Sequence, residues 1–333
     1  MKFYYLVIVI MNLFILYSFN FVSKKINLFD KPDSNRKIHL TPIANIGGLI
    51  IFINFIFFSL FSNIQHEILV TFSNQILIFC FMFLCVGVFD DKKNLNANFK
   101  LIIFLTLTTI LLIFNDNFFI TNLKFSFYEK ELSLHSYSFS FIFSVICFLA
   151  FINAVNMFDG INLQCGLYFL FVSTIFLSKG LYTDLYSTLI IGLIFFIYLN
   201  KKNLCFLGNN GTYFISFLFS CSFIYSYNSS NSFFVDEIFL IMIIPGLEMI
   251  RLTISRIVNK KHPFKADKNH LHHYLLNKYN LNKAVIISFI MFTSPYLFYL
   301  IIPDYSLLII SVSTLIYFYI IIKLKKLVNF EVQ

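Results

Sequence analysis

The sequence predicts an all-α fold, a polytopic bundle of about 11 transmembrane helices that form a single integral-membrane domain over residues 1–333. Three observations predict it. Hydrophobic residues make up 59% of the chain, whereas charged residues make up only 12%, about half the share in an average soluble domain. Mean hydropathy is +0.80. Apolar stretches long enough to cross a bilayer recur from one end of the chain to the other.

The apolar stretches follow one another closely, and no soluble domain, low-complexity linker or clear internal repeat interrupts them. They cover residues 3–22, 42–61, 68–89, 98–115, 138–154, 164–178, 185–200, 211–228, 235–256, 283–302 and 305–322. The first is too long for the apolar core of a typical signal peptide and lacks a small-residue cleavage site, so we expect it to be retained. The six cysteines show no metal-ligand spacing and are expected to pack as small apolar side chains.

Basic residues are distributed unevenly over the connecting loops. If the first stretch exits into the cytoplasm and the others alternate, only four of the 25 Lys and Arg residues fall on the outer side: Lys2, Lys124, Lys130 and Lys179. Cytoplasmic loops of membrane proteins are enriched in Lys and Arg. We therefore expect the N-terminus to lie outside and the C-terminus to be cytoplasmic.

Clusters of polar residues lie at the ends of these stretches, on the side expected to be cytoplasmic. Polar groups at the end of a membrane helix are costly to bury and are usually functional. We therefore expect an active site at the cytoplasmic membrane surface, formed by five loops. These loops lie near residues 36–48, 90–100, 153–164, 207–212 and 251–273.

Asp90 and Asp91 end the third apolar stretch. Neighbouring residues on a helix project about 100° apart, so the two carboxylates cannot chelate one ion symmetrically. At a helix C-terminus they oppose the negative end of the helix dipole and favour nearby cations, for which Lys92 and Lys93 are candidates. A solvated pair of loop carboxylates is the alternative.

Four polar residues after the fifth stretch recur at intervals of three and would share one face of a helix. They are Asn153, Asn156, Asp159 and Asn162. Their oxygens suit a hard ion such as magnesium, which also takes phosphate oxygens from a nucleotide. For each residue alone, an N-cap or turn is the alternative. The segment Gly208–Thr212 offers a similar choice, between an N-cap for the next helix and backbone N–H groups for a phosphate.

The longest cytoplasmic loop contains His270, His272 and His273 among several lysines. Asp267 would share a helical face with His270 and His273, which raises a zinc site as a hypothesis, but structural zinc usually employs thiolates and none is near. We interpret the loop as a pocket for phosphates, which would raise the pKa values of the imidazoles and favour their charged form. A basic loop that merely binds lipid headgroups is the alternative.

Taken together, five ordered motifs resemble the polyprenyl-phosphate N-acetylhexosamine-1-phosphate transferase family, the undecaprenyl-phosphate GlcNAc-1-phosphate transferase-like enzymes of glycosyltransferase family 4. The resemblance spans about residues 24–275. The motifs are R-K-x-H-x-x-P…G-G at Arg36–Gly48, D-D-x-x-x-L at Asp90–Leu95, N-A-x-N-M-x-D-G at Asn153–Gly160, L-G-x-x-G-[ST] at Leu207–Thr212 and P-x-x-[DE]…R…P-F-x-x-D-x-x-H-x-H-H at Pro245–His273.

The resemblance implies transfer of an N-acetylhexosamine 1-phosphate from a UDP-sugar to undecaprenyl phosphate or another polyprenyl phosphate, with release of UMP. This step would initiate a lipid-linked surface glycan, such as an O-antigen, at the bacterial inner membrane. Magnesium is the implied cofactor, with manganese as its substitute. Because one pyrophosphate link replaces another, such an enzyme mainly has to neutralise and align two anions.

The resemblance also implies roles for individual residues. Asp90, with Asp91 beside it, would orient or deprotonate the lipid phosphate, and the three histidines with Arg256 would hold the diphosphate. The candidate catalytic residues are Asp90, Asp91, Asp159 and His270. The candidate substrate-binding residues are Arg36, Lys37, His39, Asn153, Asn162, Arg256, Asp267, His272 and His273. The candidate metal ligands are Asn156 and Asn209.

The sequence departs from the family pattern at three places. Asn209 stands where the family usually has an Asp that binds magnesium, so a raised magnesium requirement is expected. Leu163-Gln164 replaces the Gly-Leu that completes the family's D-G-x-[DN]-G-L run, which bears on the choice of sugar. Glu248 stands where the most similar members have Asp, a mild change.

Two other functions compete with the transferase. A transporter or flippase of lipid-linked sugars would carry ionisable residues near the midpoints of its spans, whereas Asp and Glu cluster at the ends here. A catalytically silent relative acting as an assembly scaffold is suggested by Asn209. CDP-alcohol phosphotransferases also use Asp-Gly motifs, but the residues that follow in their pattern are missing after Gly160. The expected partners are a UDP-N-acetylhexosamine and a polyprenyl phosphate in the membrane, without nucleic acid, and a homodimer is one option for the oligomeric state.

Overall fold

The computed structural model describes residues 2–32, 41–62, 67–230, 232–263 and 267–330, and these residues are mostly helical, as the sequence predicts. The α-helices are α1 (Lys2–Ile26), α2 (Gly47–Ser62), α3 (Glu67–Lys93), α4 (Ala97–Phe114), α5 (Tyr137–Phe158), α6 (Gln164–Ser178), α7 (Thr183–Lys201), α8 (Gly208–Ser230), α9 (Val235–Ile241), α10 (Ile243–Val258), α11 (Leu271–Lys278), α12 (Leu281–Ile301) and α13 (Ser306–Phe330). The short elements are the 3₁₀ helices η1 (Asp116–Phe118) and η2 (Pro303–Tyr305) and the strands β1 (Phe29–Asp30), β2 (Ile43–Ala44), β3 (Asn122–Phe125) and β4 (Tyr128–Ser133).

Every apolar stretch found in the sequence overlaps a helix, and the ninth is a pair of helices, α9 and α10, bent by 76°. Among the described residues, seven helices are long and apolar enough to cross a membrane, or eight if the bent pair forms one span. Two other apolar helices, α2 and α6, are shorter; the 15 residues of α6 rise only about 22 Å, less than the thickness of a hydrocarbon core. The chain is a multi-pass membrane protein, and the count of eleven spans stays a prediction.

The helices form two compact units, Met1–Lys100 with Cys165–Leu218, and Leu101–Gln164 with Phe219–Gln333. In the first unit, α2 packs against α7, α3 and α1. Asn12 of α1 and Asn54 of α2 are fully buried and exchange side-chain hydrogen bonds of 2.6 and 3.1 Å. Paired amides are a common way to hold membrane helices together, because an unpaired amide in hydrocarbon is costly.

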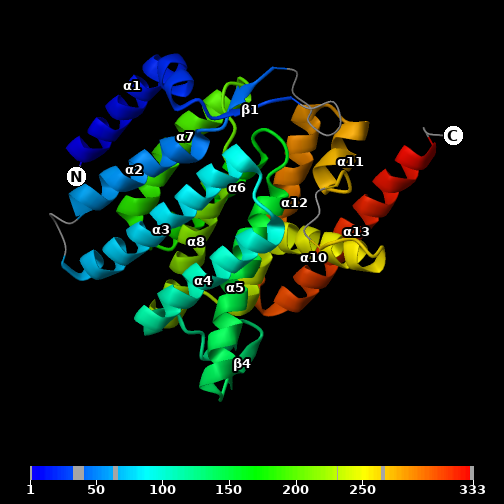
Figure 1. Ribbon diagram of the computed structural model, residues 1–333. Helices are drawn as coiled ribbons and strands as arrows, with labels where there is room; N and C mark the ends of the chain where they lie inside the picture. Colours follow the sequence, from blue (N-terminus) through cyan, green and yellow to red (C-terminus); the bar gives the residue numbers. More distant parts are fainter. Residues whose placement is uncertain (1, 33–40, 63–66, 231, 264–266, 331–333) are drawn as a thin grey trace. The chain divides into compact units, whose positions relative to one another are not determined.

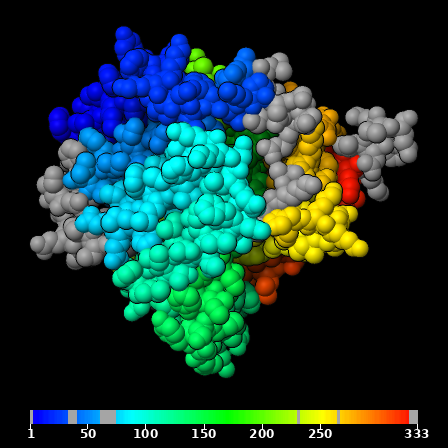
Figure 2. Space-filling model, viewed as in Figure 1, coloured from blue at the N-terminus to red at the C-terminus, as the bar shows by residue number. Residues whose placement is uncertain are grey.

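The second unit is centred on α10, which packs against α5, α12 and α13 and lies across α12 and α13 in Figure 1. Its polar and apolar faces are inverted relative to a helix of a soluble protein. Glu248 and Arg256 are buried, whereas Ile250, Ile254 and Ile257 are exposed, and part of this helix is visible in yellow at the surface in Figure 2. Exposed apolar side chains are expected where lipid is the solvent.

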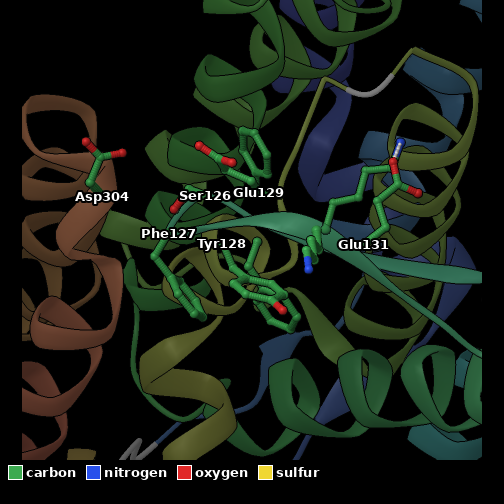
Figure 3. Close-up of a pocket in the computed structure, with 10 residues that line it drawn as sticks. Ser126, Phe127, Tyr128, Glu129, Glu131 and Asp304 are labelled. Atoms are coloured by element: carbon green, nitrogen blue, oxygen red, sulfur yellow. Dashed lines mark ion pairs between the residues drawn. The ribbon is translucent and has the colours of Figure 1, made fainter.

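A β-hairpin, β3 with β4, lies at one end of the second unit and is held at its turn. Ser126 donates its backbone N–H to Asp236 at 3.0 Å, and its hydroxyl contacts the other carboxylate oxygen of Asp236 and the carbonyl of Pro303. The hairpin borders a cavity of about 550 Å³, with Glu129, Tyr128 and other hairpin residues on its walls (Figure 3). No residue predicted for the active site lines this cavity.

Candidate active site

Three of the five motif loops meet in the first unit. Backbone hydrogen bonds join the segment 44–48 to the segment 205–207: Phe206 donates to Ala44, Gly47 to Phe206 and Gly48 to Leu207. This pairing places the end of the first motif beside the start of α8, where the fourth motif lies. The second motif, at the end of α3, joins them through Asp91.

Asp91 caps the N-terminus of α8, although it lies 118 residues away from it in the chain. Its two carboxylate oxygens accept the backbone N–H groups of Asn209 and Asn210 at 3.0 and 3.1 Å, and the side-chain amide of Asn210 at 2.6 Å. The positive end of a helix dipole stabilises such a carboxylate. The N–H groups that the sequence offers to a phosphate are therefore taken by Asp91 in this structure.

The glycine at the start of α8 is needed for this contact. Gly208 has a φ of +75°, a conformation that L side chains rarely adopt. A β-carbon added there would also lie 2.8 Å from a carboxylate oxygen of Asp91. The backbone conformation at the start of α8 and the close approach of Asp91 thus explain the glycine of the fourth motif.

Asp90 points to a different set of partners and is only 2% exposed. Its carboxylate accepts the Tyr213 hydroxyl at 2.6 Å, the Leu95 backbone N–H at 2.8 Å and the Lys100 ammonium at 3.0 Å. A buried carboxylate needs such donors, because burial without them costs several kcal/mol. The sequence indicated Lys92 or Lys93 as the cation beside the two Asp residues, whereas the structure places the Lys100 ammonium on Asp90.

The other two motif loops meet in the second unit, but not with the predicted helical geometry. The prediction that Asn153, Asn156, Asp159 and Asn162 share one helical face is wrong, because α5 ends at Phe158. Asp159 is its C-cap with an extended backbone, and Asn162 lies in the turn that follows. The turn ends at Leu163, whose φ of +73° suits glycine better. This is the position where the family usually has Gly.

Gly160 lies directly against the ring of His272. A β-carbon added to Gly160 would overlap three atoms of that imidazole. The Asp-Gly pair of the third motif therefore leaves space for a histidine of the fifth motif, which comes from the first turn of α11.

The three histidines form one cluster. Their ring centroids lie 4.5 Å apart for His272 and His273, 5.1 Å for His270 and His272, and 6.3 Å for His270 and His273. The helix α11 begins only at Leu271, with His270 as its N-cap, so the prediction that Asp267, His270 and His273 share a helical face is also wrong.

Arg256 joins this cluster from α10. It is buried and donates to the Asp267 carboxylate at 2.9 Å and approaches His270 Nε2 with Nη2 at 3.3 Å. A guanidinium has no acceptor, so His270 Nε2 must be unprotonated here and the proton must be on Nδ1. That nitrogen lies 3.7 Å from a carboxylate oxygen of Glu248. The imidazole is therefore neutral in this structure.

Burial supports the same assignment. It lowers the pKa of His270 to about 4, against the opposing effect of Glu248, and it lowers the pKa of His272 well below its ordinary value. Burial tends to raise the pKa of Asp267, but the hydrogen bond from Arg256 is among the contacts that hold it below its ordinary value. The neutral imidazoles of His270 and His272, beside a guanidinium, can each accept a proton or donate one to an arriving anion.

Substituting Gly160 with Ala tests the packing of the third motif against the fifth. The added methyl group has to displace the His272 ring, and a displacement of about 1 Å at an active site can cost up to 100-fold in rate. We expect a loss of 10- to 100-fold in the activity proposed below, measured as initial rate. Gly246→Ala is the matched control, because a β-carbon there meets nothing within 4 Å. Equal activity of the two variants would contradict this role of Gly160.

A protein-family comparison agrees with the arrangement of these motifs. The family model described as glycosyl transferase family 4 matches residues 74–227, which include the second, third and fourth motifs. Over these residues the chain is similar to glycosyl transferase family 4.

Curated proteins extend the similarity over most of the chain. A probable undecaprenyl-phosphate N-acetylglucosaminyl 1-phosphate transferase of Bacillus subtilis is 29% identical over 268 residues, 77% of this chain and 71% of the relative. The undecaprenyl-phosphate alpha-N-acetylglucosaminyl 1-phosphate transferase of Thermotoga maritima is 25% identical over 80% of this chain and 78% of its own length. The Escherichia coli O157:H7 protein with the same name is 25% identical over 77% of this chain and 71% of its length.

The structure places some of the predicted site residues, and others lie outside the residues that it describes. Arg36, Lys37 and His39 lie outside the described residues. Asn153 uses its amide within α5, donating to the Leu149 carbonyl at 2.7 Å. Among the described residues, no group of three or more His, Cys, Asp or Glu side chains has the geometry of a metal site, which gives no support to the zinc hypothesis.

Sequence reasoning also missed residues that hold the site together. They are Lys100, Tyr213, Asn210, Arg251 and Tyr317, with Glu248 noted only as a departure. Arg251 and Asn210 lie within the fifth and fourth motifs, but spacing does not say which groups their side chains contact. Lys100 and Tyr213 lie 10 and 123 residues from their partner Asp90, so no local pattern connects them.

Proposed function

We infer that this protein is a sugar-1-phosphate transferase, which transfers a sugar 1-phosphate from a nucleotide-diphosphate sugar to undecaprenyl phosphate. The names of its relatives state that acceptor and a glycosyl 1-phosphate transfer. The observation in the structure that supports it best is the imidazole cluster beside Arg256, packed on the Asp159–Gly160 turn. Donors grouped in this way suit a diphosphate whose charge grows during the reaction.

We propose that the donor is a UDP-N-acetylhexosamine and that UMP is the product. In this reaction an oxygen of the lipid phosphate attacks the phosphorus that carries the sugar, and the bond from that phosphorus to the UMP oxygen breaks. His270, His272 and His273 with Arg256 would bind the diphosphate and the developing charge on UMP. Asp159 and Asn162, in the turn after α5, would contact the nucleotide.

We propose that Asp90 and Asp91 serve the acceptor. The second pKa of a phosphate monoester is about 6, so much of the lipid phosphate is already a dianion at neutral pH and needs little help from a base. Asp90 would chiefly orient the phosphate, together with the Lys100 ammonium at 3.0 Å from its carboxylate. The predicted meeting of all five loops at one cytoplasmic surface stays part of this proposal.

Magnesium, with manganese as a substitute, is the metal we propose. The side chains offered by Asn156 and Asn209 are amides, and amide oxygens suit such a hard ion. Asp91 already accepts three N–H groups, so few protein carboxylate oxygens remain for the metal. When bound, the ion would neutralise part of the diphosphate charge. The donor's phosphate oxygens would then complete the coordination.

The experiment that tests the function uses membranes containing the protein, undecaprenyl phosphate and a panel of UDP-N-acetylhexosamines. We expect UMP release that depends on the lipid and on one sugar of the panel. Release of UMP without lipid would indicate a hydrolase. No release with any sugar would favour the scaffold, and lipid-linked sugar moving across vesicles without UMP release would favour the flippase.

Asn209 gives a prediction about the metal. We expect the parent to need more magnesium than the Asn209→Asp variant, because an amide offers one neutral oxygen where a carboxylate offers an anion. The half-saturating magnesium concentration, from initial rates at fixed UDP-sugar, should fall in the variant. Asn203→Asp, an exposed position before α8, adds the same charge nearby and should leave the concentration unchanged. Equal values for parent and Asn209→Asp would remove Asn209 from the metal site.

Orientation gives another prediction. We expect the histidine loop to be cytoplasmic and the β3–β4 hairpin to be external, in the bacterial inner membrane. In intact cells, an impermeant thiol reagent should label Glu129→Cys on the exposed strand β4 but not Lys268→Cys, beyond the labelling of the parent. Permeabilised cells should show labelling of both. Labelling of Lys268→Cys from outside would reverse the topology.

A further inference from the structure

The hydroxyl of Tyr317, on helix α13, bridges the ion pair between Glu248 and Arg251, next to His270 of the histidine cluster. It accepts a hydrogen bond from Arg251 Nε at 2.7 Å and donates to an oxygen of Glu248. Arg251 Nη2 lies 2.9 Å from each oxygen of the same Glu248 carboxylate. Tyr317 is fully buried and Glu248 is 1% exposed, so neither reaches the solvent. The three side chains therefore form one closed network.

This network holds the backbone on both sides of His270. Glu248 accepts the N–H of Leu271, the residue after His270, at 2.7 Å. Arg251 donates to the carbonyl of Asn269, the residue before it, at 2.7 Å. An oxygen of the same carboxylate lies 3.7 Å from His270 Nδ1, so its negative charge faces the imidazole. The network is thus a clamp on His270: it holds the residue on each side of it, and the Glu248 carboxylate faces its imidazole.

Tyr317 is the part of the clamp that comes from outside the motifs. It lies after the region matched by the family model and after the histidine motif, and its ring packs inside the second unit through α13. Without its hydroxyl, the buried Glu248 carboxylate would lose one donor and the partly buried Arg251 guanidinium would lose one acceptor. Unpaired buried polar groups are costly, and the network would rearrange to satisfy them.

We propose that Tyr317 is a positioning residue for His270: it acts on the reaction through Glu248 and Arg251, and it does not touch substrate. The inference rests on the proposed transferase function. The glutamate at position 248 fits this role, because its carboxylate reaches Leu271, Arg251 and Tyr317 at once.

The test is a double-mutant cycle of Tyr317→Phe with His270→Ala, in which kcat is measured from the transfer of radiolabelled sugar to undecaprenyl phosphate. Tyr317→Phe keeps the ring and removes only the hydroxyl. We expect it to lower kcat about 10-fold in the parent, with an unchanged KM for the lipid, and by less than about 2-fold in the His270→Ala background. Tyr319→Phe is the matched control, because Tyr319 is on the same helix and 63% exposed; its kcat should equal that of the parent.

Each outcome decides the inference. An equal loss of kcat in both backgrounds would mean that Tyr317 supports the fold in general. No loss of kcat in the parent would mean that the clamp is dispensable. Either result overturns the inference. If Tyr317→Phe does not fold, Arg251→Lys takes its place in the cycle, because a single ammonium cannot reach Tyr317, Glu248 and Asn269 together. A parent that releases no UMP overturns the proposed function itself, whereas an active parent with an additive cycle overturns this inference alone.

Discussion

Replacing His270 with Ala is expected to reduce UMP release by about 100-fold or more while leaving a folded membrane protein. The imidazole occupies a position that several contacts fix: Arg256 at Nε2, Glu248 facing Nδ1 and its two backbone neighbours held by the same network. Ala removes the ring but none of the backbone contacts, so the loop is expected to stay in place. The measurement is the initial rate at saturating lipid and UDP-sugar.

His135→Ala is the matched control, because His135 is exposed in the loop after β4, far along the chain from the cluster. It should keep the activity of the parent. Near-parental activity of His270→Ala would contradict the transferase mechanism proposed here, and an equal loss in both variants would point to damage from the substitution in general.

The protonation of His270 adds a pH dependence with a definite sign. The free protein holds this imidazole neutral, with a pKa lowered to about 4 chiefly by burial. A bound diphosphate favours the charged form and raises the pKa, so binding is coupled to proton uptake. Donor affinity should therefore strengthen as pH falls from 7 toward 5, and this dependence should weaken in His270→Ala. Affinity that is independent of pH in the parent would mean that the histidines bind the diphosphate without taking up protons.

The sequence predicts which motifs matter better than it predicts how they meet. Helices overlap every predicted stretch because the length of an apolar segment is a local property that can be read directly from the sequence. The contact between Gly160 and His272 joins segments that are more than 100 residues apart, and nothing in the spacing of either motif announces it. The order of the motifs indicated a common function, and only the structure shows the pairwise contacts.

Both helical faces that were predicted wrongly lie where a helix ends or begins. An interval of three is close to the helical period, and it relates Asn153, Asn156, Asp159 and Asn162. The helix ends before Asp159 and Gly160, however, so the last two of the four keep the spacing but not the helical backbone. His270 likewise precedes α11 instead of lying within it. A period indicates a face only while the backbone stays helical. Residues such as Asp, Asn and Gly, which favour turns, are where it is least informative.

Asp90→Asn is expected to lower transferase activity by about 100-fold, with the protein still folded. The carboxylate is 2% exposed and accepts from Lys100, Tyr213 and the Leu95 backbone. An amide keeps one acceptor oxygen but turns two N–H donors toward groups that are themselves donors, and it removes the charge that balances Lys100. Asp116→Asn, an exposed carboxylate in η1, is the matched control for the same chemical change and should leave activity unchanged.

Because the Asp90 carboxylate accepts from Lys100, Tyr213 and Leu95 of the protein itself, a loss of activity in Asp90→Asn has two explanations. If Asp90 only anchors Lys100 and Tyr213, then Tyr213→Phe, which deletes one of its donors, should lower the thermal stability in detergent and the activity in parallel with Asp90→Asn. If Asp90 also orients the lipid phosphate, Asp90→Asn should lose far more activity than Tyr213→Phe at a similar loss of stability, and its KM for undecaprenyl phosphate should rise while the KM for the UDP-sugar does not. Full activity in Asp90→Asn would remove this carboxylate from the reaction, since an amide cannot replace the negative charge that holds the Lys100 ammonium in place.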